Sequence, residues 1–186
     1  MNSTLIALIV AGTALALPGE WRVGDSAAVR VTCPMTIGGS FEVKTAALSG
    51  SVTASQNGSS GFDGSLAVDL RTLDTGIDLR NEHLRTTYLE VDRGPEYEKA
   101  TVSAIDLKGL NRDAPDGKGS FTGSLTLHGT TKPVSGTVAV RRAGAALQVT
   151  ASFPINLSDF SIREPRYLGV GVKNTVQVQV TFAVTQ

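Results

Sequence analysis

The side chains of this sequence that could do acid–base or metal chemistry are few. The 186 residues include two histidines, His83 and His128, and one cysteine, Cys33. The sequence has no His-x-x-x-His pair, no Cys–His cluster and no Gly-x-Ser-x-Gly elbow. It therefore lacks the spacing of a zinc site or of a hydrolase nucleophile. We expect no metal, no cofactor and no enzymatic activity, and we expect each histidine to make a structural hydrogen bond. An acid–base role for His83 or His128 on a hydrophobic substrate is the alternative.

No internal disulfide stabilises the fold, because a single cysteine cannot form one. Cys33 follows Val31 and Thr32 in an alternating stretch. This position predicts a buried or half-buried small hydrophobic side chain.

The arginines are stronger candidates for binding a ligand than the histidines or the cysteine. Arg80, Arg85 and Arg93 fall close together, and Arg163 and Arg166 flank a proline. A guanidinium matches the geometry of a phosphate with a two-pronged donor. These arginines are either solvated loop charges with acidic partners or a polar rim that holds the head group of an amphipathic ligand. We name Arg80, His83 and Arg163 as that rim.

Charge and composition narrow the classes of partner. Lys+Arg and Asp+Glu are both 17, so the net charge is zero, and 41% of the residues are hydrophobic. A nucleic-acid-binding protein needs a surplus of cations, which is missing here. There is also no run of like charges that would favour an anionic membrane. The length fits one folded domain, which we place at residues 17–186.

The N-terminus carries an apolar run from Leu5 to Leu17. The run is too short to span a bilayer and has the length of a secretory signal core, and residues 14–16 near its end offer a small-x-small pattern. No Lys or Arg precedes it, which departs from the usual signal. We predict a signal peptide at residues 1–16 and a periplasmic or secreted protein without stable membrane insertion. A buried first strand or an uncleaved anchor are the alternatives.

Alternation of apolar and polar residues dominates the rest of the chain. The clearest case is residues 176–182, VQVQVTF, and shorter runs occur at residues 29–32, 41–44, 66–70, 138–140 and 147–153. Period-2 alternation indicates strands with one buried face. Glycine-containing turns at residues 37–40 and 143–145 join neighbouring strands. Closely spaced strands favour an all-β antiparallel sandwich or barrel.

One segment breaks the alternation. In residues 74–89, Ile77, Leu84 and Tyr88 follow a helical spacing, and Asp74, Thr75 or Asp78 could cap a helix. We predict a short helical crossover between two strands.

Six ordered segments are similar to the YceI-like family. The most specific is residues 123–134, GSLTLHGTTKPV, which resembles that family's G-x-L-T-L-H-G-x-T-K-x-V. Residues 74–84 resemble its T-G-x-x-x-R-D-x-H-L crossover, with Asn81 at the aspartate. Residues 159–162 resemble its D-F-G-I, with Ser161 at the glycine. The other matching segments are residues 21–29, 39–41 and 88–91, and residues 25–28 lack the histidine common in the family's opening strand.

The resemblance implies an eight-stranded, lipocalin-like antiparallel β-barrel that is often exported to the periplasm. It also implies a long-chain ligand such as a polyisoprenoid or an isoprenoid quinone, and it brings no catalytic residues. A barrel of this size is either filled by its own side chains or holds one slim ligand. Small residues at Ala67, Ala104, Ala139 and Ala151, which we assign to the interior, would leave room for a ligand.

We therefore expect a carrier or storage protein for a lipid or isoprenoid. The alternatives are a filled barrel with a stress-protective or protein-interaction role, and the enzyme described above. The protein could form a homodimer with any of these functions. The residues that we expect to contact the ligand inside the barrel are Val29, Val31, Phe41, Leu66, Val68, Leu84, Tyr88, Phe121, Leu125, Leu127, Val138, Phe153, Phe160, Val178 and Val180.

Overall fold

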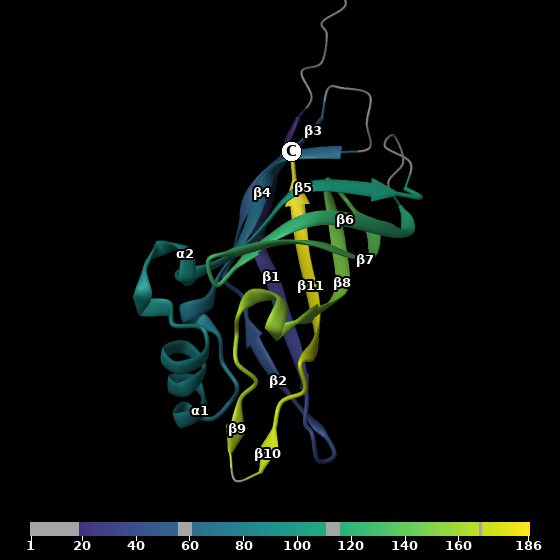
Figure 1. Cartoon of the computed structure of the whole chain (residues 1–186). Helices are drawn as coiled ribbons and strands as arrows, with labels where there is room; N and C mark the ends of the chain where they lie inside the picture. Colours follow the sequence, from purple (N-terminus) through teal and green to yellow (C-terminus); the bar gives the residue numbers. More distant parts are fainter. Residues whose placement is uncertain (1–18, 56–60, 111–115, 168) are drawn as a thin grey trace, which may run out of the picture.

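A computed structural model describes residues 19–55, 61–110, 116–167 and 169–186. The predicted signal peptide at residues 1–16 lies outside the described residues. The described chain is mostly β, and the short helical segments between β4 and β5 gather on one side (Figure 1).

Nine strands of the described chain form one antiparallel sheet that closes on itself. β1 pairs with β11, while β2 and β3 pair with opposite halves of β1 and so share one position in the barrel. The sheet therefore has eight positions, which confirms the predicted eight-stranded antiparallel barrel. The strands are β1 (Glu20–Pro34), β2 (Ser40–Thr45), β3 (Leu48–Ala54), β4 (Gly61–Asp69), β5 (Lys99–Lys108), β6 (Gly117–Leu127), β7 (Thr130–Ala143), β8 (Ala146–Asn156) and β11 (Thr175–Thr185).

Alternation along each strand produces the apolar interior. In β11, Val176 and Val178 are buried while Gln177 and Gln179 are exposed. Successive side chains on a strand point to opposite faces, so the valines line the inside and the glutamines face solvent. The same rule applies in β7, where Val138 and Val140 are buried.

A helical crossover, residues 70–98, connects β4 to β5 along one side of the barrel (Figure 1). Its buried Leu70, Leu73, Leu89 and Val91 anchor it to the hydrophobic core. The predicted crossover is thus confirmed. Its segments are the 3₁₀ turn η1 (Leu70–Thr72), the helix α1 (Asp78–His83), the π-helical turn η2 (Leu84–Tyr88), the 3₁₀ turn η3 (Val91–Arg93) and the helix α2 (Pro95–Glu98).

The predicted capping of the crossover helix is wrong in detail. The N-cap residue of α1 is Ile77, whose side chain makes no capping hydrogen bond. Asp74 and Thr75 instead bind Asn81: the Thr75 backbone N–H and hydroxyl both donate to Asn81 Oδ1 at 2.7 Å, and Asn81 Nδ2 donates to Asp74 Oδ1 at 2.7 Å. The polar residues therefore brace the loop before α1 against the helix and do not cap its first turn.

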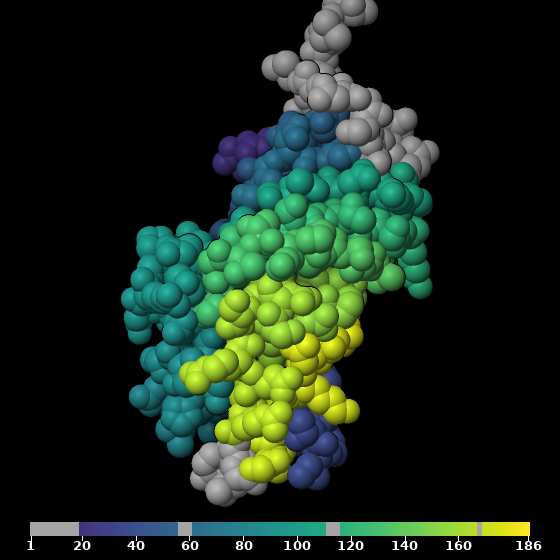
Figure 2. Space-filling model, viewed as in Figure 1, coloured from purple at the N-terminus to yellow at the C-terminus, as the bar shows by residue number. Residues whose placement is uncertain are grey.

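A second excursion joins β8 to β11. It contains the 3₁₀ turn η4 (Leu157–Phe160) and a small hairpin of β9 (Arg166–Tyr167) and β10 (Val170–Gly171). Thr36, in the turn between β1 and β2, donates its backbone N–H to Gly171 O at 2.8 Å, and Gly171 N donates to the Thr36 hydroxyl at 2.9 Å. The hairpin and the β1–β2 turn thus form one edge at the end of the barrel that α1 also approaches (Figures 1 and 2).

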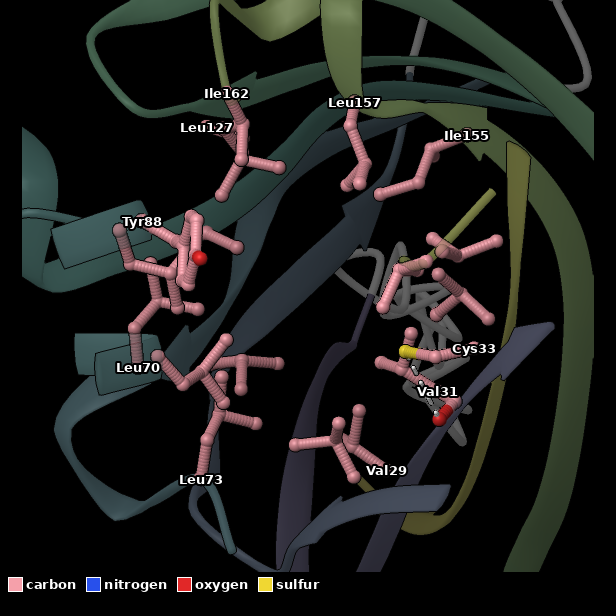
Figure 3. Close-up of a pocket in the computed structure, with 18 of the residues that line it drawn as sticks. Val29, Val31, Cys33, Leu70, Leu73, Tyr88, Leu127, Ile155, Leu157 and Ile162 are labelled. Carbon is pink, nitrogen blue, oxygen red and sulfur yellow. Dashed lines mark hydrogen bonds between the residues drawn. The ribbon is translucent and has the colours of Figure 1, made fainter. Parts of the chain in front are cut away.

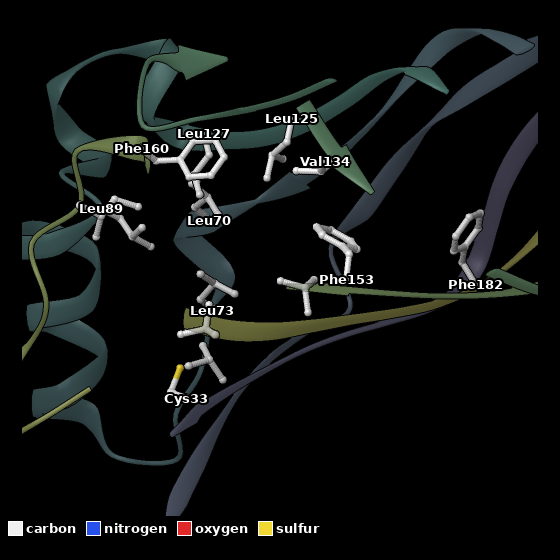
Figure 4. Close-up of a cluster of buried hydrophobic side chains, with 14 of the residues drawn as sticks. Cys33, Leu70, Leu73, Leu89, Leu125, Leu127, Val134, Phe153, Phe160 and Phe182 are labelled. Atoms are coloured by element: carbon white, nitrogen blue, oxygen red, sulfur yellow. The ribbon is translucent and has the colours of Figure 1, made fainter. Parts of the chain in front are cut away.

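The core closes around an aromatic pair. The rings of Phe121 and Phe153 lie 5.5 Å apart in an edge-to-face arrangement, which aromatic pairs prefer. Gly136 makes this approach possible, because a Cβ there would lie 2.9 Å from Phe121 Cε1 and 2.7 Å from Phe153 Cβ. Figure 4 shows Phe153 within the cluster of buried side chains.

Candidate ligand-binding cavity

A cavity of about 1090 Å³ lies inside the barrel. Its wall consists almost wholly of aliphatic and aromatic side chains from the strands and the two excursions. In Figure 3, Leu70, Leu73 and Tyr88 face Val29 and Cys33 across open space. The alternative of a filled barrel would leave no such continuous space, so the geometry favours the expected barrel with room for a ligand.

The expected interior residues lie on the wall of this cavity, with one exception. Phe160 does not line it and is only 1% exposed. The reason is that Phe160 ends η4, which buries its ring within the hydrophobic cluster but off the cavity wall (Figure 4). The residues placed on the wall as expected are Val29, Val31, Phe41, Leu66, Val68, Leu84, Tyr88, Phe121, Leu125, Leu127, Val138, Phe153, Val178 and Val180.

The assignment of small interior residues is correct only for Ala151, which lines the cavity. Ala67 lies between Leu66 and Val68, and both of these neighbours line the cavity, so alternation sends Ala67 to the outer face. Ala139 follows the lining residue Val138 and is excluded by the same argument. Ala104 has a positive φ of 49° within an irregular part of β5 and also lies outside the wall.

The open end of the cavity is marked by the wall residues that are exposed to solvent. Most wall residues are buried or half-buried. The exposed ones all belong to the helical crossover or to the β9–β10 hairpin. They are Ile77, Leu79, His83, Thr87, Arg166 and Val170. The mouth of the cavity therefore lies between α1 and the hairpin, the end that is lowest in Figure 2.

Two of the three expected rim residues are at this mouth. Arg80 and His83, both on α1, line the cavity, whereas Arg163 is exposed and does not. The neighbouring Arg166 takes the place expected for Arg163, because the hairpin turns its side chain toward the opening. Arg166 is already paired with Glu164 at 3.0 Å.

Arg80 is a cation set against an apolar wall. Its Cζ atom lies 4.4 Å from the centroid of the Phe41 ring, within cation–π range. Among the described residues no carboxylate lies within 4.0 Å of its guanidinium nitrogens. The guanidinium N–H groups are therefore available to an acceptor on a ligand.

Sequence reasoning missed several wall residues. Ile77, Leu79 and Val170 lie in the excursions, where no alternation marks an inward face. Met35 was also missed, although it follows directly on β1. Their apolar character in otherwise polar loops is the one signal that could have identified them.

Cys33 is buried, as predicted, at 8% exposure, and it also lines the cavity. Burial raises the pKa of the Cys33 thiol to about 11, and the nearby charge of Arg80 acts in the opposite direction. A thiol with so high a pKa is a poor nucleophile at neutral pH.

His128 has the structural role that the sequence predicted. It is 8% exposed, its Nδ1 lies 3.0 Å from Phe160 O and its Nε2 lies 3.0 Å from Glu90 Oε2. A carbonyl oxygen can only accept, so Nδ1 donates to it. The Tyr97 ring packs against the imidazole in an edge-to-face arrangement, with 4.8 Å between the ring centroids. His128 is not on the cavity wall, so this geometry places it away from any ligand held there.

The Glu90 carboxylate has two side-chain partners, Arg93 and His128. A hydrogen bond from the Arg93 guanidinium at 3.0 Å lowers the pKa of the Glu90 carboxyl, and the bond to His128 adds to this effect. Glu90 thus links the crossover to the β6–β7 turn that carries His128.

His83 differs from the prediction, because its exposed side chain makes no hydrogen bond to another described residue. It lies at the mouth and is free to meet a ligand.

Within the described ranges, no group of three or more His, Cys, Asp or Glu side chains is placed to hold a metal ion. No helix in these ranges is long and apolar enough to cross a bilayer.

Solved structures with the same fold come from several bacteria. A polyisoprenoid binding domain from Saccharophagus degradans, described as implicated in plant cell wall breakdown, has a TM-score of 0.67 and 19% identity, over 89% of this chain and 97% of that one. BcnA of Burkholderia cenocepacia has a TM-score of 0.63 and 21% identity, over 84% of this chain and 96% of that one. A YCEI protein of Campylobacter jejuni has a TM-score of 0.54 and 15% identity, over 75% and 81%.

Family membership is shown by sequence. None of the curated proteins matches the chain. The model of the YceI-like domain, however, matches residues 22–184, which span β1 to β11 and include every segment that lines the cavity. With the expected closed barrel also present, the chain belongs to the YceI-like family.

Proposed function

We propose that this protein binds one long apolar or amphipathic molecule inside its barrel, such as a polyisoprenoid, an isoprenoid quinone or a similar lipid, as a carrier or a store. The observation that carries the proposal is the cavity of about 1090 Å³ with its nearly continuous aliphatic and aromatic wall. Pockets for small ligands span roughly 300–1,000 Å³, so this cavity lies at the upper end of that range and has room for a large ligand.

The chemistry of the wall favours a hydrocarbon chain. Each methylene transferred from water to such a wall contributes about 0.8 kcal/mol. A chain of many methylenes or isoprene units therefore binds with few polar contacts, which agrees with the scarcity of polar side chains on the wall. The Saccharophagus degradans domain of the same fold, described as polyisoprenoid binding, supports this ligand class.

The polar end of the ligand would lie at the mouth. Arg80 and His83 are on the same helix there, and the guanidinium of Arg80 has no carboxylate partner among the described residues. Nitrogen donors at this position suit a phosphate, a carboxylate or a quinone carbonyl, so the tail would run inward past Phe41 toward Phe121 and Phe153.

Mass spectrometry tests the proposal. The purified protein is extracted with organic solvent, and the extract is compared with that of an unrelated barrel of similar size prepared in the same way. We expect a long-chain apolar molecule in the first extract, and uptake of added polyprenol by the emptied protein. A clean extract combined with no uptake of polyprenyl or fatty ligands would overturn the proposal.

The enzyme alternative has less support. His128 lies off the cavity wall and both of its ring nitrogens are bonded within the protein, which leaves only His83 near a bound molecule.

We also propose that the protein is periplasmic or secreted, from the apolar run of residues 5–17 and the resemblance of the chain to exported proteins. Fractionation of cells that express the full chain checks this location.

A further inference from the structure

The exposed large aliphatic side chains of the described residues gather at one end of the molecule. Ile37 is 67% exposed, Leu79 62%, Ile77 49% and Val170 36%. Ile77 and Leu79 lie at α1, Val170 lies in β10, and Ile37 lies in the β1–β2 turn. We refer to these four residues as the mouth rim.

The mouth rim is continuous with the cavity. Ile77, Leu79 and Val170 line the cavity as well as facing solvent. Ile37 does not line it, but its neighbour Thr36 is hydrogen-bonded to Gly171, which does. An apolar path thus runs without interruption from the outer surface to the interior. Isolated exposed aliphatic residues are ordinary, but a cluster at the mouth of an apolar cavity marks a contact surface.

The charges around the rim are of both signs. Asp78 and Glu82 are exposed on α1, while Arg166 and Lys173 are exposed near the hairpin. A surface of mixed sign matches the paired charges of zwitterionic head groups and does not require an anionic membrane. The far end of the barrel, where Glu20 and Thr185 lie, has no exposed large aliphatic side chain among the described residues.

We propose that the mouth rim docks reversibly on a zwitterionic phospholipid bilayer, so that the ligand passes between membrane and cavity without crossing water. The proposal rests on the proposed ligand-binding function, because a water-insoluble ligand makes the bilayer its source or destination. Aliphatic side chains inserted at the lipid interface give a weak, reversible attachment and no spanning segment.

Flotation with phosphatidylcholine vesicles tests the docking. Ile37→Asp places a charge on the rim without touching the cavity wall. Ala145→Asp is the matched control, since Ala145 is an exposed turn residue at the opposite end, between β7 and β8. We expect the wild type and Ala145→Asp to float with the vesicles. We expect Ile37→Asp to partition about tenfold less.

A second readout separates docking from ligand binding. Uptake of a fluorescent polyprenol from cyclodextrin should be the same in the wild type and both variants. Transfer of that polyprenol from phosphatidylcholine vesicles should slow only in Ile37→Asp. If the wild type takes up polyprenol from cyclodextrin but does not float, docking is overturned and the proposed function stands. If it floats but takes up no polyprenol, the proposed function fails and the docking surface stands.

Two further results would overturn the docking proposal. One is that Ile37→Asp floats and transfers polyprenol as the wild type does. The other is that sedimentation velocity shows a wild-type dimer that Ile37→Asp converts to a monomer, because a second copy of the chain would then be the occupant of the rim.

Discussion

The guanidinium of Arg80 lies 4.4 Å above the ring of Phe41, and both side chains face the cavity. Arg80 belongs to α1 and Phe41 to β2, so this contact fixes the helical crossover against the barrel at the cavity mouth. It also places a positive charge where an apolar tunnel meets solvent. An amphipathic ligand would meet that charge with its head group.

Arg80 should therefore discriminate between ligands by their head groups. Arg80→Gln removes the charge but keeps a polar side chain. We expect it to weaken binding of a polyprenyl phosphate by about tenfold, since charge-assisted hydrogen bonds contribute about 1.5–3 kcal/mol. Binding of the matching polyprenol should change little. Titration of both ligands by fluorescence checks this.

The control for Arg80 is Arg141→Gln, because Arg141 is exposed on β7 and does not line the cavity. It should leave both affinities unchanged. Equal losses for the phosphate and the alcohol in Arg80→Gln would contradict a head-group role for Arg80.

Cys33 reports on the state of the cavity. Its pKa is raised to about 11 by burial, so the reactive thiolate is scarce at pH 8. We expect alkylation by N-ethylmaleimide to be slow there and to speed up by about tenfold per pH unit between pH 8 and 10. A bound polyprenol should block the reaction. Reaction at pH 8 as fast as that of a free thiol, or no protection by ligand, would contradict the described position of Cys33.

His128 should matter for stability and not for ligand binding. His128→Ala leaves Phe160 O without its side-chain partner and leaves Glu90 with Arg93 alone, and an unsatisfied buried group costs about 1–3 kcal/mol. We expect a loss of about 2 kcal/mol in the free energy of unfolding by urea. His83→Ala, at an exposed position, should change it by less than about 0.5 kcal/mol. Similar losses in the two variants would contradict this assignment.

The Glu90 carboxylate makes the stability of the fold depend on pH. The Arg93 guanidinium, and then His128, lower the pKa of Glu90 below its ordinary value of 4.5. A carboxyl with a lowered folded-state pKa stabilises the fold above its unfolded pKa, and this contribution is lost as the pH falls through the folded-state pKa. We expect the difference in urea midpoint between wild type and Glu90→Gln to be at its full value above pH 4.5 and to shrink as the pH falls below it. A difference that is constant from pH 3 to 7 would count against the Glu90 interactions.

The strands were predictable because each one carries its own signal. The valines of β11 alternate with polar residues regardless of what lies across the barrel, so their inward face can be identified locally. Closure of the barrel by β1 and β11 joins the two ends of the described chain, and no local pattern predicts it. The prediction of a closed barrel rested instead on the resemblance to the YceI-like family.

The cavity mouth was predictable only in part, because loops lack a repeating pattern. Arg80 and His83 were identified, but Leu79, which directly precedes Arg80 in α1, was not, since nothing in the sequence distinguishes an exposed leucine at a cavity mouth from any other exposed leucine. Arg163 was chosen over Arg166 because sequence does not show which way the hairpin turns its side chains.

Two departures from the family pattern have physical explanations in the structure. Ser161 stands at the family's glycine and adopts a positive φ of 58°, a conformation that glycine takes most easily. Asn81 stands at the family's aspartate, and its amide donates to Asp74, which a second carboxylate could not do at neutral pH.

The central claim is that a ligand occupies the barrel interior, and a cavity-filling variant tests it most directly. Ala151→Phe adds a ring at the cavity wall, whereas Ala139→Phe adds the same ring to β7 outside the wall. Titration with a fluorescent polyprenol should show about one bound molecule per wild-type chain and per Ala139→Phe chain. Ala151→Phe, with its folding checked by circular dichroism, should bind at least about tenfold more weakly because its ring occupies the space of the ligand. Undiminished binding by folded Ala151→Phe would place the ligand elsewhere and contradict the account.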